Sequence, residues 1–174
     1  MEKNNSSVAK GNAGEHLVMA ELLYRGFQAF MADRGNSAYD ISVFRKGRYS
    51  LLRVKTTTNG CLQYSTKKNG KIFLSPAKKN DYVVIVNFSD RSKAKSLKGT
   101  RKADFYVVPT MEVKKALERA HEHYHKFTRK DGKPRKMSSR RCVFLYGNDT
   151  TTQISRGYSV KWKKYYEENG WAQL

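Results

Sequence analysis

Two side chains of opposite charge, Asp40 and Lys55, lie in the two strands of a predicted β-hairpin. Residues 38–44 alternate between apolar and polar side chains, a tight turn follows at 45–48, and residues 49–57 alternate again. Because the strands of a hairpin run side by side, this pattern brings Asp40 close to Lys55. A carboxylate can hold a divalent cation and an ammonium group can offset an anionic substrate. The alternative is an ordinary cross-strand ion pair.

The hairpin resembles the catalytic hairpin of the PD-(D/E)XK nuclease superfamily. That superfamily includes restriction-like endonucleases, Holliday-junction resolvases and endonucleases associated with group I introns. In its pattern an aspartate enters one strand, and the next strand carries a carboxylate or amide, any residue and a lysine. Here the aspartate is Asp40, and the lysine is the centre of Val54-Lys55-Thr56. The chain departs from the pattern at Arg53, where the superfamily has Glu, Asp or Gln.

The resemblance implies a site for Mg²⁺ or Mn²⁺ that serves phosphodiester hydrolysis. This reaction needs an attacking water, relief of negative charge on the phosphate and stabilisation of the leaving oxygen, and a carboxylate-held divalent ion assists all three. By the resemblance, Asp40 is the central ligand, with Glu15 and the backbone carbonyl of Val54 as further ligands. Lys55 is expected to position the water and to offset phosphate charge.

The assignment of Glu15 rests on its place in a helix upstream of the hairpin. In members of the superfamily such a helix often carries a glutamate that helps to bind metal, and Gly14-Glu15 resembles that feature. A second interpretation stays open. Residues 12–15 also fit a capping box, in which the glutamate only closes the start of the helix.

Arg53 decides how much of the function carries over, because arginine cannot coordinate a metal and stays cationic. An inward guanidinium about 4 Å from the ion would oppose it by roughly 4 kcal/mol per unit charge at an effective dielectric near 20. In a first interpretation, Arg53 turns outward to phosphate while Asp40 and Glu15 hold one ion. In a second, Arg53 pairs with Asp40 or Glu15, and the protein binds DNA without a metal. The third interpretation is that Arg53 replaces an original Glu or Gln by mutation.

The elements around the hairpin predict a single α/β domain over residues 1–174, with a mixed central β-sheet flanked by helices, similar to restriction endonucleases. The nearly continuous apolar runs at 82–88 and 105–109 indicate central strands covered on both faces. Other strands are expected at 27–31 and 143–146, a second hairpin from 62–65 and 72–74, and a long helix from an N-cap at Thr110 to about Phe127. In the first helix, at about 8–24, the apolar stripe comprises Ala9, Ala13, Leu17, Ala20 and Tyr24, widened by Val18 and Leu22.

The charge of the chain favours a polyanionic partner. The 174 residues include 35 Lys and Arg against 15 Asp and Glu, a formal net charge of +20. Such an excess repels itself unless it meets a polyanion, so DNA or RNA is the expected partner. An anionic membrane is the rival, but there is no apolar run of about 18 residues. We therefore expect a soluble, cytoplasmic protein without a membrane partner.

Two segments, 90–103 and 126–141, gather the basic residues and are predicted to be loops that contact DNA phosphates. The alternative is that these charges only face solvent. With the basic tip of the second hairpin, the candidate DNA-binding residues are Lys67, Lys68, Arg91, Lys93, Lys95, Lys98, Arg101, Lys102, Arg129, Lys130, Arg135, Lys136, Arg140 and Arg141.

Three smaller features complete the sequence. The two cysteines, Cys61 and Cys142, lie far apart and are expected to be reduced thiols. Histidines alternate at 121, 123 and 125, where two of them either share a metal or suit the end of a helix dipole. The aromatic residues at 162–171 are predicted to pack in the core, with a base-stacking platform as the alternative.

Together these features predict a Mg²⁺-dependent or Mn²⁺-dependent DNA endonuclease that acts on double-stranded or branched DNA. A homodimer or larger homo-oligomer is expected, because cutting two strands usually takes two such sites. Two other classes remain open. One is a non-cleaving DNA-binding protein on the same scaffold, and the other is an RNA- or ribosome-associated module.

Overall fold

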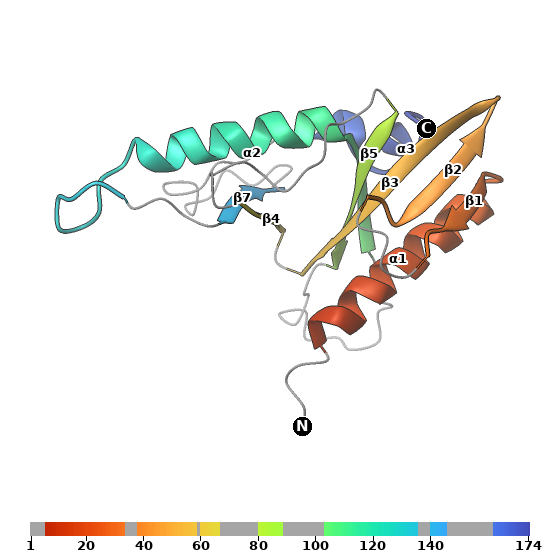
Figure 1. The fold of residues 1–174 in the computed structure, drawn as a ribbon, viewed down its shortest axis with the longest axis horizontal. Coiled ribbons are helices and arrows are strands. Elements are labelled where there is room, and N and C mark those ends of the chain that lie inside the picture. Colours follow the sequence, from red (N-terminus) through yellow and green to blue (C-terminus); the bar gives the residue numbers. More distant parts are fainter. Residues whose placement is uncertain are drawn as a thin grey trace.

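A mixed five-stranded sheet in the order β1-β2-β3-β5-β6 runs through the computed structural model (Figure 1). Its strands are β1 (Gln28–Met31), β2 (Ile41–Arg45), β3 (Arg48–Thr57), β5 (Asp81–Phe88) and β6 (Ala103–Pro109). The strands β1 to β3 form an antiparallel meander, β3 and β5 are parallel, and β5 and β6 are antiparallel. The structure describes residues 6–33, 38–58, 60–66, 80–88, 103–135, 140–145 and 162–174.

Helices cover both faces of this sheet, as predicted. Helices α1 (Ser6–Tyr24) and α3 (Glu167–Trp171) share one apolar cluster with the sheet. On the opposite face lie α2 (Thr110–His125), the 3-10 helix η2 (Lys163–Tyr165) and a two-stranded sheet of β4 (Cys61–Ser65) and β7 (Arg140–Phe144). Among the described residues, no helix is long and apolar enough to cross a membrane.

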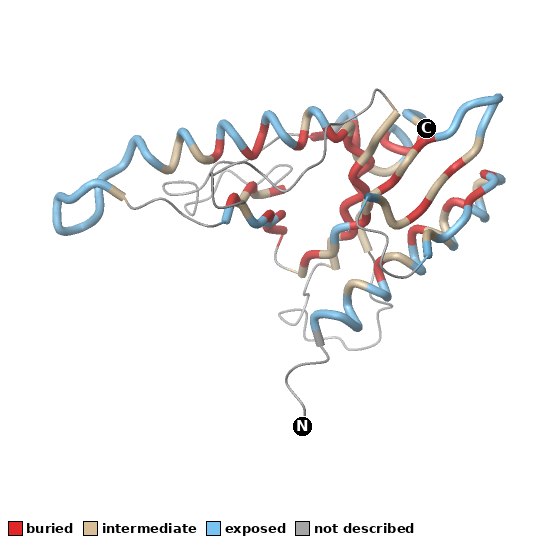
Figure 2. The backbone as a smooth tube through the Cα atoms, in the orientation of Figure 1, coloured by how far each residue is buried: buried red, intermediate tan, exposed pale blue. Residues whose placement is uncertain are grey.

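The strand β5 is central and apolar on both faces, as its sequence predicts. Val83 and Ile85 pack with α2, whereas Val84 and Val86 pack with α1, and all four are fully buried. This two-sided burial explains the run of β-branched residues. Figure 2 shows the buried residues concentrated where the strands cross the middle of the fold.

The strand β6 differs from its prediction, because it lies at an edge of the sheet as described rather than between two strands. Its apolar residues are nevertheless buried by the C-terminal segment. Tyr166 bridges to Tyr106 along the edge of β6, and Trp171 packs against Phe105 with ring centroids 5.5 Å apart. Covering an edge in this way blocks pairing with another chain. The prediction that these aromatic residues pack in the core is confirmed, since Trp171 is only 2% exposed.

The helix α1 is confirmed, but its buried face is not the predicted stripe. The five residues expected there are exposed, and Tyr24 is 89% exposed. The helix turns Gly14 toward the sheet together with Val18 and Leu22, the two residues that were predicted only to widen the stripe. Apolar residues surround much of this helix, so their spacing alone does not orient it. The orientation follows from the close approach of Gly14 to Thr56 of β3.

Three local predictions on the other face are corrected. The strand β4 pairs with β7, whereas the partner expected for it at 72–74 lies outside the described residues. The second basic segment was expected to be a loop throughout, but its last two residues, Arg140 and Arg141, begin β7. Thr110 is the first residue of α2 rather than its N-cap, which is Pro109.

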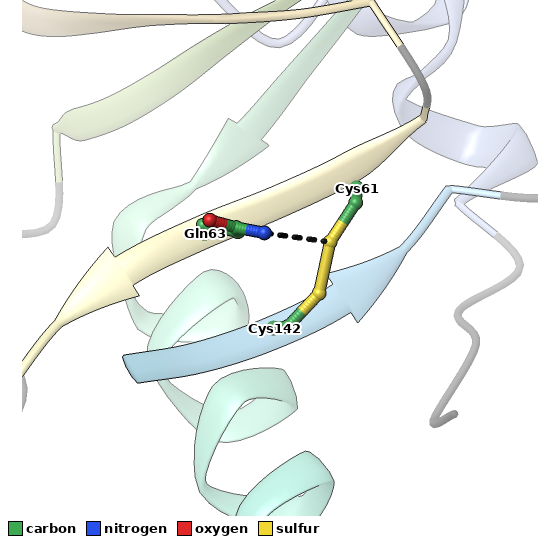
Figure 3. Close-up of a disulfide and its surroundings, with 3 residues drawn as sticks. All are labelled: Cys61, Gln63 and Cys142. Carbon is green, nitrogen blue, oxygen red and sulfur yellow. Dashed lines mark hydrogen bonds between the residues drawn. A yellow bond between two sulfur atoms is a disulfide. The ribbon is translucent and has the colours of Figure 1, made fainter. Parts of the chain in front are cut away.

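The prediction of two reduced thiols is wrong, because Cys61 and Cys142 form a disulfide (Figure 3). The register of β4 and β7 places Cys142 opposite Gln63, so the disulfide crosses the pair diagonally. The cysteines are 81 residues apart in the sequence, and only the pairing of β4 with β7 brings them together. The spacing of the two cysteines in the sequence therefore did not indicate the disulfide.

Candidate active site

Asp40 and Lys55 lie on the same face of the sheet, as the hairpin predicts. The strands β2 and β3 turn buried side chains such as Val43 and Val54 toward α1. Because side chains alternate along a strand, Arg53 and Lys55 project to the opposite face, and Asp40, whose backbone N–H bonds to Leu52 just before β2, follows the same alternation. The arrangement that would have contradicted a catalytic pair, with the two residues on opposite faces, is absent.

The carboxylate of Asp40 is held by the backbone of the neighbouring strand. Its Oδ2 accepts a hydrogen bond from the backbone N–H of Val54 at 2.7 Å. The backbone N–H of Asp40 donates to the carbonyl of Leu52 at 2.8 Å. The Asp40 carboxylate thus accepts the hydrogen bond that a backbone carbonyl would accept within a sheet. This bond fixes the orientation of the carboxylate. Asp40 and Lys55 are not paired within 4 Å among the described residues, so the simple ion-pair interpretation is not supported.

Two pockets of about 470 Å³ each meet at this pair. The first, which we call the helix pocket, combines Glu15 and Lys10 of α1 with Asp40, Val54 and Lys55 of the hairpin. The second, the Arg53 pocket, is lined by Tyr39, Asp40, Arg53, Lys55, Gln63, Tyr64 and Ser65. The predicted residues Asp40, Lys55, Glu15 and Val54 therefore come together, and Arg53 lies on the other side of the pair.

Glu15 lies in the interior of α1, because the helix begins at Ser6. A capping box at residues 12–15 is thereby excluded. Burial and the charge of Asp40 raise the pKa of the Glu15 carboxyl, and His16 and Lys55 oppose this rise. The two carboxylates are therefore close enough to repel each other, which a bound cation would relieve.

The glycine before Glu15 sets the distance between helix and sheet. A Cβ atom on Gly14 would lie 2.2 Å from Oγ1 of Thr56, far inside van der Waals contact. Only glycine lets α1 approach β3 this closely, and this approach brings Glu15 to the same pocket as Asp40.

The Arg53 guanidinium is directed to a backbone carbonyl. Its Nε donates to the carbonyl oxygen of Ala38 at 2.5 Å. In the part of the chain that the structure describes, Arg53 forms no ion pair with Asp40 or Glu15. The interpretation in which Arg53 neutralises one of these carboxylates therefore lacks its expected contact.

Two residues of β4, Gln63 and Tyr64, line the site although the sequence did not point to them. Tyr64 is 6% exposed, and its hydroxyl has no hydrogen-bond partner among the described residues. Burial raises the pKa of this hydroxyl, Arg53 lowers it, and Asp40 raises it. The Lys55 Nζ lies 5.4 Å from the centroid of the Tyr64 ring. The sequence predicted a strand at 62–65 but assigned it to a second hairpin, so it did not indicate that these residues line the site.

The described candidate DNA-binding residues of the second basic segment differ in how far they are exposed. Arg129 and Lys130 are exposed in the turn after α2, and Arg135 stacks on Tyr124 with its guanidinium 4.5 Å from the ring centroid. Arg140 is exposed at the start of β7, whereas Arg141 is 5% exposed and burial lowers the pKa of its guanidinium. Outside the described residues lie Lys67, Lys68, Arg91, Lys93, Lys95, Lys98, Arg101, Lys102 and Lys136.

The histidines of α2 do not build a metal centre with neighbouring ligands. His121 and His125 meet edge to face, with centroids 4.3 Å apart. Burial, Arg141 and His125 lower the pKa of His121, with a small opposing effect of Glu122. Within the described ranges, no group of three or more His, Cys, Asp or Glu side chains is placed to hold a metal.

The helix pocket fits an oxygen-preferring divalent cation, with two carboxylates among the described residues that line it. Asp40 and Glu15 provide the negative charge. Val54, whose backbone carbonyl is the further ligand expected, also lines the pocket. Mg²⁺ retains several waters and needs only a few protein oxygens, so two carboxylates and a carbonyl are a suitable partial shell.

The comparisons with known proteins support the fold. No protein-family model matches the sequence, and no curated protein matches it. The structure is similar to that of a bacterial homing endonuclease, I-Ssp6803I, with a TM-score of 0.51 at 15% sequence identity. The match covers 97% of this chain and 92% of that chain. At this identity the likeness concerns the fold, and it confirms the predicted restriction-endonuclease-like α/β architecture.

Proposed function

We propose that this protein is a DNA endonuclease that requires Mg²⁺ or Mn²⁺. One observation carries the proposal: Asp40, Glu15 and Lys55 line a single pocket, in a fold similar to that of a homing endonuclease. Two carboxylates and a lysine in one pocket suit the hydrolysis of a phosphodiester.

Each residue has a distinct part in this proposal. Asp40 and Glu15 hold the cation, with the backbone carbonyl of Val54 as a further ligand, and the bound cation supplies an activated water and charge neutralisation. Lys55 orients the attacking water and offsets the charge of the phosphate. Arg53, which faces the Arg53 pocket, binds a phosphate oxygen of the DNA.

The DNA would run from this site along the basic surface. Arg129 and Lys130 are exposed in the turn after α2, which extends away from the sheet (Figure 1). Arg135 follows this turn and Arg140 is the first residue of β7, and the bases outside the described residues would add further phosphate contacts. We propose double-stranded or branched DNA as the partner and a homodimer or larger homo-oligomer as the active form.

The test is the cleavage of supercoiled, linear and branched DNA with Mg²⁺, Mn²⁺ or EDTA. The wild-type protein should cut only with a metal, and Lys55→Ala should lower the rate by at least about a hundredfold, as loss of a catalytic group does. Lys114→Ala is a matched control, because Lys114 is exposed on α2 and lines neither pocket. Cleavage that survives Lys55→Ala would contradict the site assignment.

The variant Arg53→Glu separates the enzyme from the non-cleaving alternative. Glutamate at this position restores the pattern of the superfamily. If only Arg53→Glu cuts, while the wild-type protein binds DNA without cutting it, the natural protein is a DNA-binding protein on a nuclease scaffold.

A further inference from the structure

Three residues form the boundary between the two pockets. Of the described residues, only Asp40, Lys55 and Gln63 line both the helix pocket and the Arg53 pocket. Two of them are the proposed catalytic pair. The third, Gln63, comes from β4 and carries a carboxamide, whose oxygen is a suitable ligand for a hard divalent cation.

The side chain of Gln63 is exposed, and the disulfide beside it holds one end of the amide. Its Nε2 donates to Sγ of Cys61 at 3.7 Å, and Figure 3 shows the amide oxygen at the opposite end. This oxygen has no hydrogen-bond partner among the described residues. An amide whose nitrogen is directed to the sulfur presents its oxygen away from the disulfide.

The carboxylates alone leave the site one ligand short of the pattern that it resembles. Arginine at position 53 provides no oxygen, and its guanidinium is directed to the carbonyl of Ala38. From this geometry we infer that Gln63 provides the missing side-chain oxygen to the cation held by Asp40 and Glu15. The inference deepens the proposed function and rests on it.

A neutral ligand suits the charges already present. Asp40 and Glu15 already line the helix pocket together, so a third carboxylate would add repulsion before the cation binds. An amide oxygen completes more of the shell without further negative charge. The ligand oxygen that the superfamily has at position 53 on β3 is thus provided here by Gln63 on β4. Arg53 can then contact phosphate.

The experiment measures Mn²⁺ binding to the whole protein without DNA, by isothermal titration calorimetry. Gln63→Ala should raise the dissociation constant for Mn²⁺ about tenfold or more, as loss of an ordered partner at a metal site does. Gln63→Glu, which keeps a ligand oxygen, should bind Mn²⁺ at least as tightly as the wild-type protein. Gln28→Ala is the matched control, because Gln28 is an exposed strand glutamine that lines neither pocket.

Asp40→Asn distinguishes failure of this inference from failure of the proposed function. If Asp40→Asn loses Mn²⁺ binding while Gln63→Ala binds within twofold of the wild-type protein, the role of Gln63 is overturned and the nuclease site stands. If the wild-type protein shows no saturable Mn²⁺ binding, both proposals fail. Weaker binding in Gln63→Ala, with unchanged binding in Gln28→Ala, supports the inference.

Discussion

At the scale of single residues, the ionisation of Glu15 links the site to stability. Burial and Asp40 raise the pKa of its carboxyl above the ordinary value of 4.5. A raised pKa in the folded state means that the protonated carboxyl favours folding and the ionised carboxyl opposes it. This contribution is fully present below the unfolded-state pKa and is lost as the pH rises through the folded-state pKa. At neutral pH the carboxylate therefore destabilises the metal-free protein.

The first prediction is that Glu15→Gln raises the melting temperature of the metal-free protein at neutral pH. The advantage over the wild-type protein should shrink as the pH falls through the folded-state pKa and vanish below 4.5, where Glu15 is protonated in both states. Saturating Mn²⁺ should stabilise the wild-type protein more than the variant, since the variant has lost a ligand. Thermal melts over a pH series, with and without Mn²⁺, measure all three effects. A variant that melts lower at neutral pH without metal would contradict the assigned environment.

Residue types and spacing pointed to five residues that line this site, namely Asp40, Lys55, Glu15, Val54 and Arg53. The sequence brought Asp40 and Lys55 together because their hairpin is local, but it left the direction of the Arg53 side chain open. Gln63 and Tyr64 were not singled out, because the strand at 62–65 was expected to pair with 72–74, whereas it pairs with β7, far away in the sequence. The disulfide between Cys61 and Cys142 was missed for the same reason.

At the scale of elements, the contact of α1 with β3 positions Glu15. Gly14 faces Thr56, and an added Cβ atom would meet the threonine Oγ1 at 2.2 Å. Gly11, one turn earlier in the same helix, has no atom within 4 Å of an added Cβ. Substituting the two glycines therefore distinguishes two effects. Both substitutions change the helix propensity, but only the one at Gly14 disturbs a close contact with β3. The sequence predicted this helix correctly but not its buried face, because apolar residues occur on several sides of it.

The second prediction is that Gly14→Ala destabilises the protein by about 1–3 kcal/mol, the usual effect of overpacking. Gly11→Ala should instead leave it unchanged or stabilise it by up to about 1 kcal/mol, because alanine favours a helix. Urea unfolding of both variants gives the two free energies of unfolding. We also expect Gly14→Ala to weaken Mn²⁺ binding, because α1 must shift and carry Glu15 with it. Equal stability of the two variants would show that α1 does not approach β3 as described.

At the scale of the whole molecule, charge dominates the surface. A formal net charge of +20 on 174 residues predicts a polyanion as partner, but it does not say which bases touch it. The structure distinguishes them in part. Arg129 and Lys130 are exposed beyond the end of α2, whereas Arg141 is buried in β7 and its removal would perturb packing. A charge count from sequence treats these residues as equivalent because it contains no burial.

The third prediction concerns the salt dependence of DNA binding. Removing Arg129 and Lys130 together by alanine substitution should weaken binding to a duplex. It should also reduce the slope of log affinity against log salt by up to about 2, since each phosphate contact contributes roughly 0.9. Fluorescence anisotropy over a salt series measures the slope. The matched control replaces Lys114 and Lys115 of α2 by alanine, which removes the same charge. A slope that falls equally in both double variants would show that only total charge matters.

The fold as a whole was predictable to the level of its class. The hairpin, the apolar strand β5 and the long helix α2 have strong local patterns, and together they indicate a mixed sheet flanked by helices. The position of β6 at the edge of the described sheet and the pairing of β4 with β7 depend on contacts between distant segments. Local alternation and helical spacing do not contain this information.

The central claim is that one divalent cation binds between Asp40 and Glu15 while Arg53 points elsewhere. A crystal structure of the protein with Mn²⁺, with an anomalous difference map, tests it most directly. We predict a peak about 2.2 Å from a carboxylate oxygen of Asp40, in the pocket that Glu15 and Lys55 also line. A map with no peak there, and with the Arg53 guanidinium paired to Asp40 instead, would contradict the claim.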